Sequence, residues 1–239
     1  MKKISLIIIT GVLVACSKNK DNSNSTPTPT ALTRIKAQTS GALVRTYFYD
    51  VQGRAVKVDN NDGGKKEYEY PDGKVIRKYY NTNGDYQYSN IEELNAEGYT
   101  VRSTRNNQPT WEYLYTYNAD KTLSKQIMKS NSIIVKDFFW NNGNLDSIRF
   151  STQNGSWNYT ELKTYYTDKP NALGDIVFGE EYWGKNSKNL LKSSFNRFPD
   201  GSTSIKDVYT YEHDNQSRVT KQTITSDNGN VYIALNTYN

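Results

Sequence analysis

Aromatic and polar residues alternate along much of this chain with a period of two. Tyr113, Tyr115 and Tyr117 fall on one face of a strand, whereas Leu114 and Thr116 fall on the other. A strand places successive side chains on opposite faces and favours aromatic and β-branched residues. The pattern therefore predicts β-strands, and the same alternation recurs in "KKEYEY" and "DVYTYE".

These alternating runs recur in units that join an aromatic strand to a basic, β-branched strand through a polar turn. The copies are "TYFYDVQGRAVKV" (46–58), "YEYPDGKVIRKYY" (68–80), "YTYNADKTLSKQI" (115–127), "FFWNNGNLDSIRF" (138–150) and "YTYEHDNQSRVTKQTI" (209–224). Turns as short as "DVQGR" and "NADK" join only antiparallel neighbours, so each unit is predicted to be a β-hairpin. One aromatic residue is expected immediately before each turn, at Tyr49, Tyr70, Tyr117, Trp140, Tyr166, Phe198 and Tyr211.

The repeat predicts an all-β fold, a long antiparallel meander of about 14 to 18 strands. Open twisted sheets rarely exceed about ten strands, so this sheet is expected to curl or close. The mean hydropathy of −0.83 leaves too few apolar residues for two packed sheets. We therefore expect a wide barrel or a strongly curved single sheet, with tyrosines covering a polar interior. Helix signals are nearly absent, and "NIEELNAEG" and "SKNLLKSS" are each predicted to form one short helical turn.

The N-terminal residues have the character of an export signal. Lys2 and Lys3 precede a short apolar stretch that ends in "LVAC" at Cys16, the single cysteine of the chain. The stretch is too short for a membrane-spanning helix and is typical of a signal peptide. "LVAC" resembles the lipobox of bacterial lipoproteins, which implies lipidation of Cys16; the alternative is an ordinary secretory signal with an incidental cysteine.

The domain boundaries follow from this interpretation. Residues 1–15 are the predicted signal peptide, and residues 16–33 are the lipidated cysteine and a flexible tether rich in Ser, Thr, Asn and Pro. Residues 34–239 are the predicted single β domain. Its lack of cysteine excludes disulfides, so packing and backbone pairing must stabilise it.

The charge of the chain gives no sign of a nucleic-acid partner. The formal net charge is +5, from 30 basic and 25 acidic residues. Removal of Lys2 and Lys3 with the signal leaves 28 basic residues against 25 acidic ones, a net charge of +3. The basic residues are interleaved with acidic ones, as on a solvated surface, and form no block that would track a phosphate backbone.

The sequence offers no convincing catalytic constellation, and we predict neither an enzyme nor a cofactor. His213 is the single histidine and lies in a turn, which leaves no His/Cys metal site. The stretch "VDNNDGG" resembles a calcium loop, yet no bidentate Glu follows at the required distance. Glu180 and Glu181 are adjacent, so in a strand they would point to opposite faces and not converge on one bond.

The tryptophans are the remaining candidates for a binding site. Exposed aromatic faces stack on sugar rings, and neighbouring polar side chains hydrogen-bond the hydroxyls. Trp157 and Trp183 lie in the irregular part of the repeat, and with Tyr182 they are the predicted ligand-binding residues. The alternative is that each of these rings packs against a cross-strand neighbour.

Parts of the chain resemble two known families. The cadence of "YFYDVQGRAVKV" resembles the YD repeats of RHS-type proteins, which wind into β-shells. The segments "YTDKPNALGD" (166–175) and "YWGKNSKNLLKSS" (182–194), taken with the lipobox, are similar to a family of Bacteroidales lipoproteins described as having a porin-like fold. The likeness covers essentially the whole mature domain. It implies a barrel-like fold and an outer-envelope location, and it brings no activity, substrate or catalytic residue.

Three functions follow for a predicted monomer that is lipid-anchored at the outer membrane, on a side that the sequence leaves open. The first is non-catalytic binding of a glycan or a peptide. The second is a structural role that holds an outer-membrane partner. The third is a membrane-spanning porin, which needs strands with an uninterrupted apolar face of about 10 residues, and the repeat units are short of that.

Overall fold

The protein domain is a closed antiparallel β-barrel, seen in a computed structural model that describes residues 33–130 and 132–239. The predicted signal peptide, Cys16 and nearly all of the predicted tether lie outside the described residues, so these expectations stay predictions. The predicted all-β meander is confirmed. The sequence predicted either a barrel or a strongly curved single sheet, and the structure is a closed barrel.

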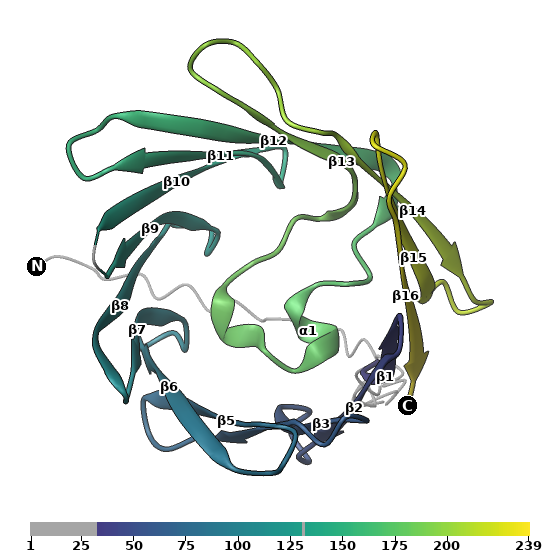
Figure 1. The fold of residues 1–239 in the computed structure, drawn as a ribbon. Helices are drawn as coiled ribbons and strands as arrows, with labels where there is room; N and C mark the ends of the chain where they lie inside the picture. The colour runs from purple at the N-terminus through teal and green to yellow at the C-terminus, as the bar shows by residue number, and fades with distance from the viewer. Residues whose placement is uncertain (1–32, 131) are drawn as a thin grey trace, which may run out of the picture. The chain divides into compact units, whose positions relative to one another are not determined.

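The described residues contain sixteen strands, each paired with its neighbours in chain order, and the last strand pairs with the first (Figure 1). This number falls inside the predicted range. The strands are β1 (Ile35–Ser40), β2 (Leu43–Tyr49), β3 (Ala55–Asn60), β4 (Lys65–Glu69), β5 (Lys74–Tyr80), β6 (Tyr86–Leu94), β7 (Thr100–Arg105), β8 (Gln108–Tyr117), β9 (Leu123–Lys129), β10 (Ile133–Asn141), β11 (Asn144–Thr152), β12 (Trp157–Pro170), β13 (Asn189–Arg197), β14 (Asp207–His213), β15 (Val219–Ser226) and β16 (Val231–Tyr238).

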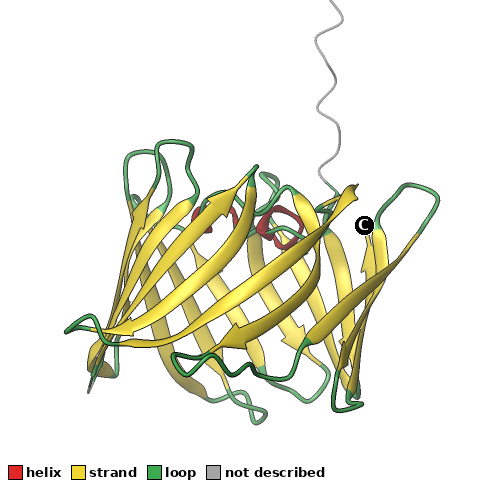
Figure 2. Ribbon diagram, turned by 90° about the horizontal axis from the view of Figure 1, so that it is seen from above, coloured by secondary structure: helices red, strands yellow, loops and turns green. Residues whose placement is uncertain are grey.

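The connection between β12 and β13 is the exception to the simple meander. Residues 171–188, here called the plug, carry a short helix α1 (Asp175–Phe178) and a single 3-10 turn η1 (Glu181–Trp183). Figure 1 shows the plug inside the ring of strands, and Figure 2 shows its helices near one end of the barrel. We call this end, where even-numbered strands finish and odd-numbered strands begin, the plug rim, and the opposite end the far rim.

Neither helix of the described residues is long and apolar enough to cross a membrane.

The turns at the plug rim show why the repeat carries Asp, Gly and Arg at fixed positions. Asp50 Oδ1 accepts the backbone N–H groups of Gln52 and Arg54 at 3.0 and 2.9 Å, and Arg54 Nε donates to Asp50 Oδ2 at 2.8 Å. Gly53 has φ 79°, a conformation that costs glycine nothing. Asp214 and Arg218 repeat the same bonds in the turn between β14 and β15.

The aromatic residues of the repeat fasten each pair of strands at the plug rim. A side chain near the end of an even-numbered strand donates a hydrogen bond to a backbone carbonyl near the start of the preceding strand, an arrangement we call an aromatic latch. Seven of the eight strand pairs have one, with donor–acceptor distances of 2.6–2.9 Å. The latches are Tyr49–Ile35, Tyr70–Ala55, Tyr117–Thr100, Trp140–Leu123, Tyr165–Leu145, Tyr211–Leu191 and Tyr238–Val219.

Five of the predicted pre-turn aromatics form latches, and two do not. Tyr166 was one residue out of place, because β12 continues past its latch residue, Tyr165, to Pro170 and so gives no strand end that marks the latch. The Tyr166 hydroxyl donates instead to the Tyr209 carbonyl. Phe198 lies in the turn between β13 and β14, at the far rim. The eighth pair, β5 and β6, ends in Leu94, which carries no hydroxyl to donate.

The two predicted helical turns are wrong. "NIEELNAEG" belongs to β6 and the turn after it, and "SKNLLKSS" leads into β13. In β6 the alternation separates a fully buried Glu92 from the more exposed Glu93, which is a strand pattern. The two helices lie instead within "GDIVFGEEYW", so Glu180 and Glu181 are not on a strand. They still do not converge, because Glu180 bonds to Lys66 whereas Glu181 bonds to Arg34.

Backbone hydrogen bonds tie the plug to three turns of the plug rim. Ala55 N–H donates to the Gly179 carbonyl at 3.2 Å, Lys185 N–H donates to the Lys121 carbonyl at 2.9 Å, and Lys188 N–H donates to the Gly143 carbonyl at 2.9 Å. Because Ala55, Lys121 and Gly143 follow three different even-numbered strands, the plug is fixed across the barrel and not along one wall.

Gly179 makes the first of these contacts possible. It has φ 70°, and a Cβ placed there would lie 2.6 Å from the Ala55 nitrogen and 2.9 Å from the Gly53 carbonyl oxygen. Both contacts are with backbone atoms, which cannot move aside without opening the rim turn.

The outer wall of the barrel carries many ion pairs. Tyr68 faces the lumen, because its hydroxyl bonds to Glu180 of the plug, so Glu67 and Glu69 face outward. The same alternation places ion pairs around much of the outside. They are Lys57–Asp59, Lys65–Glu67, Lys78–Glu69, Arg102–Glu112, Lys129–Glu112, Lys125–Asp137 and Lys221–Glu212.

Removal of one latch hydroxyl is expected to lower the stability of the barrel. Tyr238→Phe keeps the ring but leaves the Val219 carbonyl without this donor, so the free energy of unfolding in urea should fall by about 1 kcal/mol. Tyr232→Phe in the same strand is the matched control, since Tyr232 is exposed and its change should stay within about 0.5 kcal/mol. Equal losses in both variants would show that the latch bond contributes nothing specific.

Gly179→Ala is expected to detach the plug or to distort the turn that follows β2. The clash with two backbone atoms adds to the strain of the positive φ, and we expect a loss on the order of 2–4 kcal/mol in the free energy of unfolding. Gly73→Ala is the control, because Gly73 has φ 66° with open space around it and suffers the strain alone. A plug that mattered little would give the two variants the same unfolding midpoint.

Candidate functional site

The aromatic side chains of η1 pack against the wall of the barrel on the side of β3 to β8. Tyr182 is 6% exposed and lies in the hydrophobic cluster formed with Ala55, Val58, Tyr68 and Val75. The Trp183 ring lies 5.2 Å from the Tyr182 ring and 5.5 Å from the ring of Tyr115 on β8. The two predicted site residues of the plug are therefore together, and they are rigidly held.

Glu180 forms a buried polar contact directly beside this cluster. Its carboxylate accepts a hydrogen bond from Lys66 Nζ at 3.0 Å and another from the Tyr68 hydroxyl. Burial alone would raise the pKa of the Glu180 carboxyl, but Lys66, Tyr68 and the Arg77 guanidinium outweigh it and hold that pKa below its usual range. Glu180 is thus a charged anchor of the plug, and it is unsuited to act as a general acid.

A second buried pair, Arg77 with Glu92, lies under the plug. Glu92 is fully buried, and Arg77 also lies with its guanidinium 5.2 Å from the centre of the Trp183 ring. Several polar atoms around this pair have no hydrogen-bond partner among the described residues, and an unpaired buried polar atom costs about 1–3 kcal/mol. They are Arg77 Nε, Glu92 Oε2, Thr100 Oγ1, Ser103 Oγ and the Tyr182 hydroxyl.

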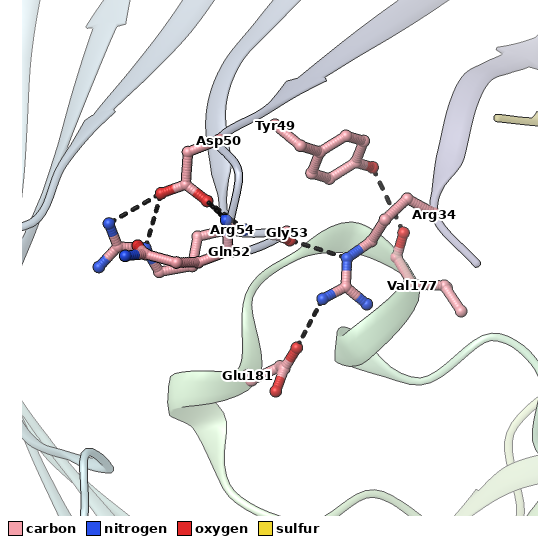
Figure 3. A network of polar contacts seen from close by, with 8 residues as sticks. All are labelled: Arg34, Tyr49, Asp50, Gln52, Gly53, Arg54, Val177 and Glu181. Atoms are coloured by element: carbon pink, nitrogen blue, oxygen red, sulfur yellow. Dashed lines mark hydrogen bonds and ion pairs between the residues drawn. The ribbon is translucent and has the colours of Figure 1, made fainter. Parts of the chain in front are cut away.

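Arg34 holds the other side of the plug to the rim (Figure 3). Its Nε donates to the Gly53 carbonyl at 2.7 Å, and its Nη2 donates to Glu181 Oε1 at 2.8 Å. The Tyr49 hydroxyl lies 3.3 Å from the Val177 carbonyl oxygen of α1. Arg34 is only 4% exposed, so a single buried guanidinium joins the start of the barrel to η1.

A pocket of about 540 Å³ opens between Glu181, which Arg34 holds, and the neighbouring turns of the plug rim. It lies where the latch is missing, because Leu94 takes the place that a tyrosine has in the other strand pairs. Its lining is both aromatic and polar, which is the usual character of a small-molecule site. The pocket, here called the rim pocket, is lined by Gln52, Arg54, Tyr70, Val75, Leu94, Glu97, Gly98, Tyr99, Gly179, Glu181 and Tyr182.

Another hollow, of about 440 Å³, lies where the plug returns to the wall near β10 to β12. Its lining is dominated by amides and lysines, among them Asn141, Asn144, Lys163 and Asn189, with Tyr165 as its one aromatic residue. The rim pocket therefore has the better chemistry for a ligand with both an apolar face and polar groups.

The structure brings together two of the three predicted ligand-binding residues. Tyr182 and Trp183 are adjacent in the plug, and Tyr182 lines the rim pocket. Trp157 begins β12 at the far rim, where its half-buried ring pairs across the sheet with Ser151. Trp157 and Trp183 are thus at opposite ends of the barrel and do not form one site.

Most of the pocket residues were not predicted from the sequence. Tyr70 is a latch residue of the regular repeat, and Arg54 is a turn residue, so each already had a structural explanation. Tyr99 and Leu94 flank "NAEG", where the repeat is degenerate, and that irregularity was the available signal. The plug completes the pocket from a segment far away in the chain, which no local pattern reveals.

The other candidate residues have structural roles. His213 ends β14 beside the turn at Asp214. In "VDNNDGG", Asn61 Oδ1 accepts the Val44 N–H at 3.0 Å and Asp62 Oδ1 accepts the Gly64 N–H at 2.9 Å, so the loop side chains support hairpin turns. Within 33–130 and 132–239, no three His, Cys, Asp or Glu side chains gather as metal ligands.

Comparison with known proteins finds similarity at the level of the fold. No protein-family model and no curated protein sequence matches this chain. Among solved structures, a porin-like protein from Bacteroides uniformis aligns with a TM-score of 0.62 and 16% identity, over 87% of this chain and 95% of its own. A porin-like protein from Bacteroides vulgatus aligns with a TM-score of 0.61 and 14% identity, over 87% of this chain and 99% of its own. The porin-like fold implied by the sequence resemblance is thereby confirmed.

Proposed function

We propose that this chain is a non-catalytic binding protein of the cell envelope that holds a glycan in its rim pocket. The observation that carries the proposal is the lining of that pocket, where Tyr70, Tyr99 and Tyr182 meet Gln52, Arg54 and the carboxylates of Glu97 and Glu181. Aromatic rings stack on the apolar faces of sugars, and the polar side chains hydrogen-bond the hydroxyls around the ring edge.

The pocket is preorganised, which favours binding. Its lining residues lie in rim turns, at the adjoining ends of β5 and β6, and in the plug, which the backbone bonds of Ala55, Lys121 and Gly143 hold in place. Little side-chain or loop freedom remains to be lost when a ligand enters, so less of the interaction energy is spent on ordering.

The outer wall argues against the membrane-spanning alternative. A porin presents an apolar band to lipid, and a Lys or Arg at the bilayer midplane costs about 2–4 kcal/mol. Here the outward faces of β3 to β9 carry ion pairs such as Lys57–Asp59, Lys65–Glu67 and Arg102–Glu112. This wall is suited to contact with water. The similarity to porin-like proteins therefore supports a common fold and does not support insertion into a bilayer.

An envelope location with a lipid anchor completes the proposal. The supports are the "LVAC" sequence at Cys16, the polar tether after it, and the porin-like fold shared with two Bacteroides proteins. A diacylated or triacylated cysteine anchors a protein stably, at about 0.8 kcal/mol for each buried methylene. We place the protein at the outer membrane. The scaffold function remains the alternative if no ligand binds.

Ligand binding is tested by screening the full-length protein on an array of glycans and peptides, followed by titration of each hit. We expect a glycan to bind, and Tyr99→Ala to weaken it by about tenfold or more through loss of a stacking face. Phe139→Ala is the control, since Phe139 is 49% exposed and faces outward from β10. Equal affinity of Tyr99→Ala and the wild type, or an array without a glycan hit, would contradict the rim pocket as a glycan site.

The anchor is tested by replacing Cys16 with Ser and separating membranes from soluble material. Because the thioether-linked lipid cannot form on serine, the variant should move from the membrane fraction to the soluble fraction and lose labelling by a fatty-acid precursor. A Cys16→Ser variant that remains with the membranes would mean that something other than acyl chains holds the protein there.

A further inference from the structure

A row of aromatic side chains lines the inner wall of the barrel from the plug toward the far rim. Tyr115 faces the lumen, because its ring contacts Trp183 of the plug, and the strand period then places Tyr113 and Trp111 on the same face of β8. Neighbouring rings are close, with centroids 6.3 Å apart for Tyr115 and Tyr113 and 4.6 Å apart for Tyr113 and Trp111. All three are half-buried, so each keeps part of its surface accessible.

Arg105 continues this row at the far rim, as the last residue of β7. Its guanidinium lies 4.1 Å from the centre of the Tyr88 ring and 4.5 Å from that of the Trp111 ring. Its hydrogen bonds within the described residues go to the neutral side chains of Asn90 and Gln108, at 3.1 and 3.3 Å. Aromatic and amide groups therefore hold the guanidinium in place. These two hydrogen bonds leave other N–H donors of the guanidinium available.

Two other cations share the inner face in the same half of the barrel. Arg45 lies on the lumen side of β2 with Tyr47, and its nearest hydrogen-bond acceptor is the Gln38 amide at 3.5 Å. Lys136 lies on β10, where its ammonium is 5.0 Å from the centre of the Phe150 ring. Strand direction places all three cations nearer the far rim than the plug.

The inner-wall carboxylates offset only part of this charge. Glu92 is paired with Arg77, and Glu161 of β12 is paired with Lys163. Both pairs are internally neutral. Asp207, on the inner face at the start of β14, is one further carboxylate and accepts a hydrogen bond from Ser226. The three cations outnumber it, so the far half of the lumen keeps a positive character beside its aromatic row.

We infer that the far half of the lumen is a second binding site, which takes an oligosaccharide whose sugar rings carry carboxylates. Sugar rings lie against Trp111 and Tyr113, and a ring carboxylate accepts hydrogen bonds from Arg105, whose planar fork matches a carboxylate in a bidentate manner. Arg45 and Lys136 draw the anionic chain into the lumen from other sides. The site lies at the opposite end of the barrel from the rim pocket and does not depend on it.

The combination of aromatic rings and cations favours an acidic sugar over a neutral sugar and over a single-stranded nucleic acid. A neutral sugar would use the aromatic row and leave Arg105 without a counter-charge. A single-stranded nucleic acid would match the charge and the stacking, but its phosphates extend along a backbone, and the cations here face one another around a lumen. The carboxylate on the ring itself fits cations that lie directly beside the stacking faces.

The test is a tryptophan-fluorescence titration of the full-length protein with oligogalacturonate and with an uncharged galactan oligomer of the same length. The two probes differ at the carboxylate. We expect the acidic probe to bind about tenfold more tightly or better, and added salt to weaken its binding alone. Arg105→Gln should remove most of this preference while changing the affinity for the neutral probe less than about twofold.

Matched variants locate the site. Arg197→Gln removes the same charge from the end of β13, where the side chain is exposed on the outer face, and should change nothing. If Arg105→Gln fails to fold, Lys136→Gln replaces it, since it leaves the bonds of Arg105 intact, and it should weaken the acidic probe by about threefold or more. Trp111→Leu should weaken both probes.

Three outcomes would overturn the inference. They are equal affinities for the two probes, equal losses in Arg105→Gln and Arg197→Gln, and competition by single-stranded DNA as strong as that of oligogalacturonate. Loss of acidic-probe binding in Tyr99→Ala with Arg105→Gln unaffected would also reject the lumenal site, and it would leave the rim pocket standing. Unchanged acidic-probe affinity in Tyr99→Ala supports two separate sites.

Discussion

The hydrogen bond from an aromatic side chain to a backbone carbonyl of the preceding strand is the interaction on which this barrel depends. A wide barrel with a mean hydropathy of −0.83 cannot fill its interior with aliphatic side chains. Tyrosine solves this because its ring covers the wall while its hydroxyl satisfies a carbonyl at the rim. Repetition of the bond at Tyr49 of β2, Tyr117 of β8 and Tyr165 of β12 fixes the same rim at separate points of the ring.

The plug lies beside the position of the missing latch, and together they form the rim pocket. Where Leu94 replaces a tyrosine, no hydroxyl fills the rim, and the rim pocket occupies that place. Tyr182 of the plug approaches from the lumen and supplies an aromatic ring that the strand pair lacks. A departure from the repeat in the wall is thus matched by a departure from the repeat in the connection between β12 and β13, and the candidate site forms where the two meet.

The strands and turns were predictable from sequence because their causes are local. Alternation of Tyr113, Tyr115 and Tyr117 specifies a strand, and Asp50 with Gly53 and Arg54 specifies a turn through bonds that span four residues. The latch positions were predictable where the strand ends at its aromatic residue. β12 instead continues past its latch Tyr165 to Pro170, so the sequence pattern misplaced the latch by one residue.

The plug and the lumenal sites were not predictable, because their causes lie far apart in the chain. Nothing near Glu180 indicates that Lys66 and Tyr68 will receive it, more than a hundred residues away. Charge interleaving suggested an ordinary solvated surface, and it is one on the outside. The sequence did not reveal that Arg45, Arg105 and Lys136 all point into the lumen. Alternation within one strand does not say which of its faces is the inner one, and these residues lie in three different hairpins.

The even number of strands has a consequence for the ends of the chain. Ile35 pairs with Tyr238, and the Asn239 N–H donates to the Arg34 carbonyl at 3.2 Å, so the domain begins and finishes at the same point of the plug rim. The barrel is therefore close to a circular molecule. A peptide linker joining these ends, with new termini opened at the exposed turn of Asn106 and Asn107, would leave every strand in place and move both termini to the far rim. In such a closed barrel, the position of the termini can therefore be changed without altering the binding surface.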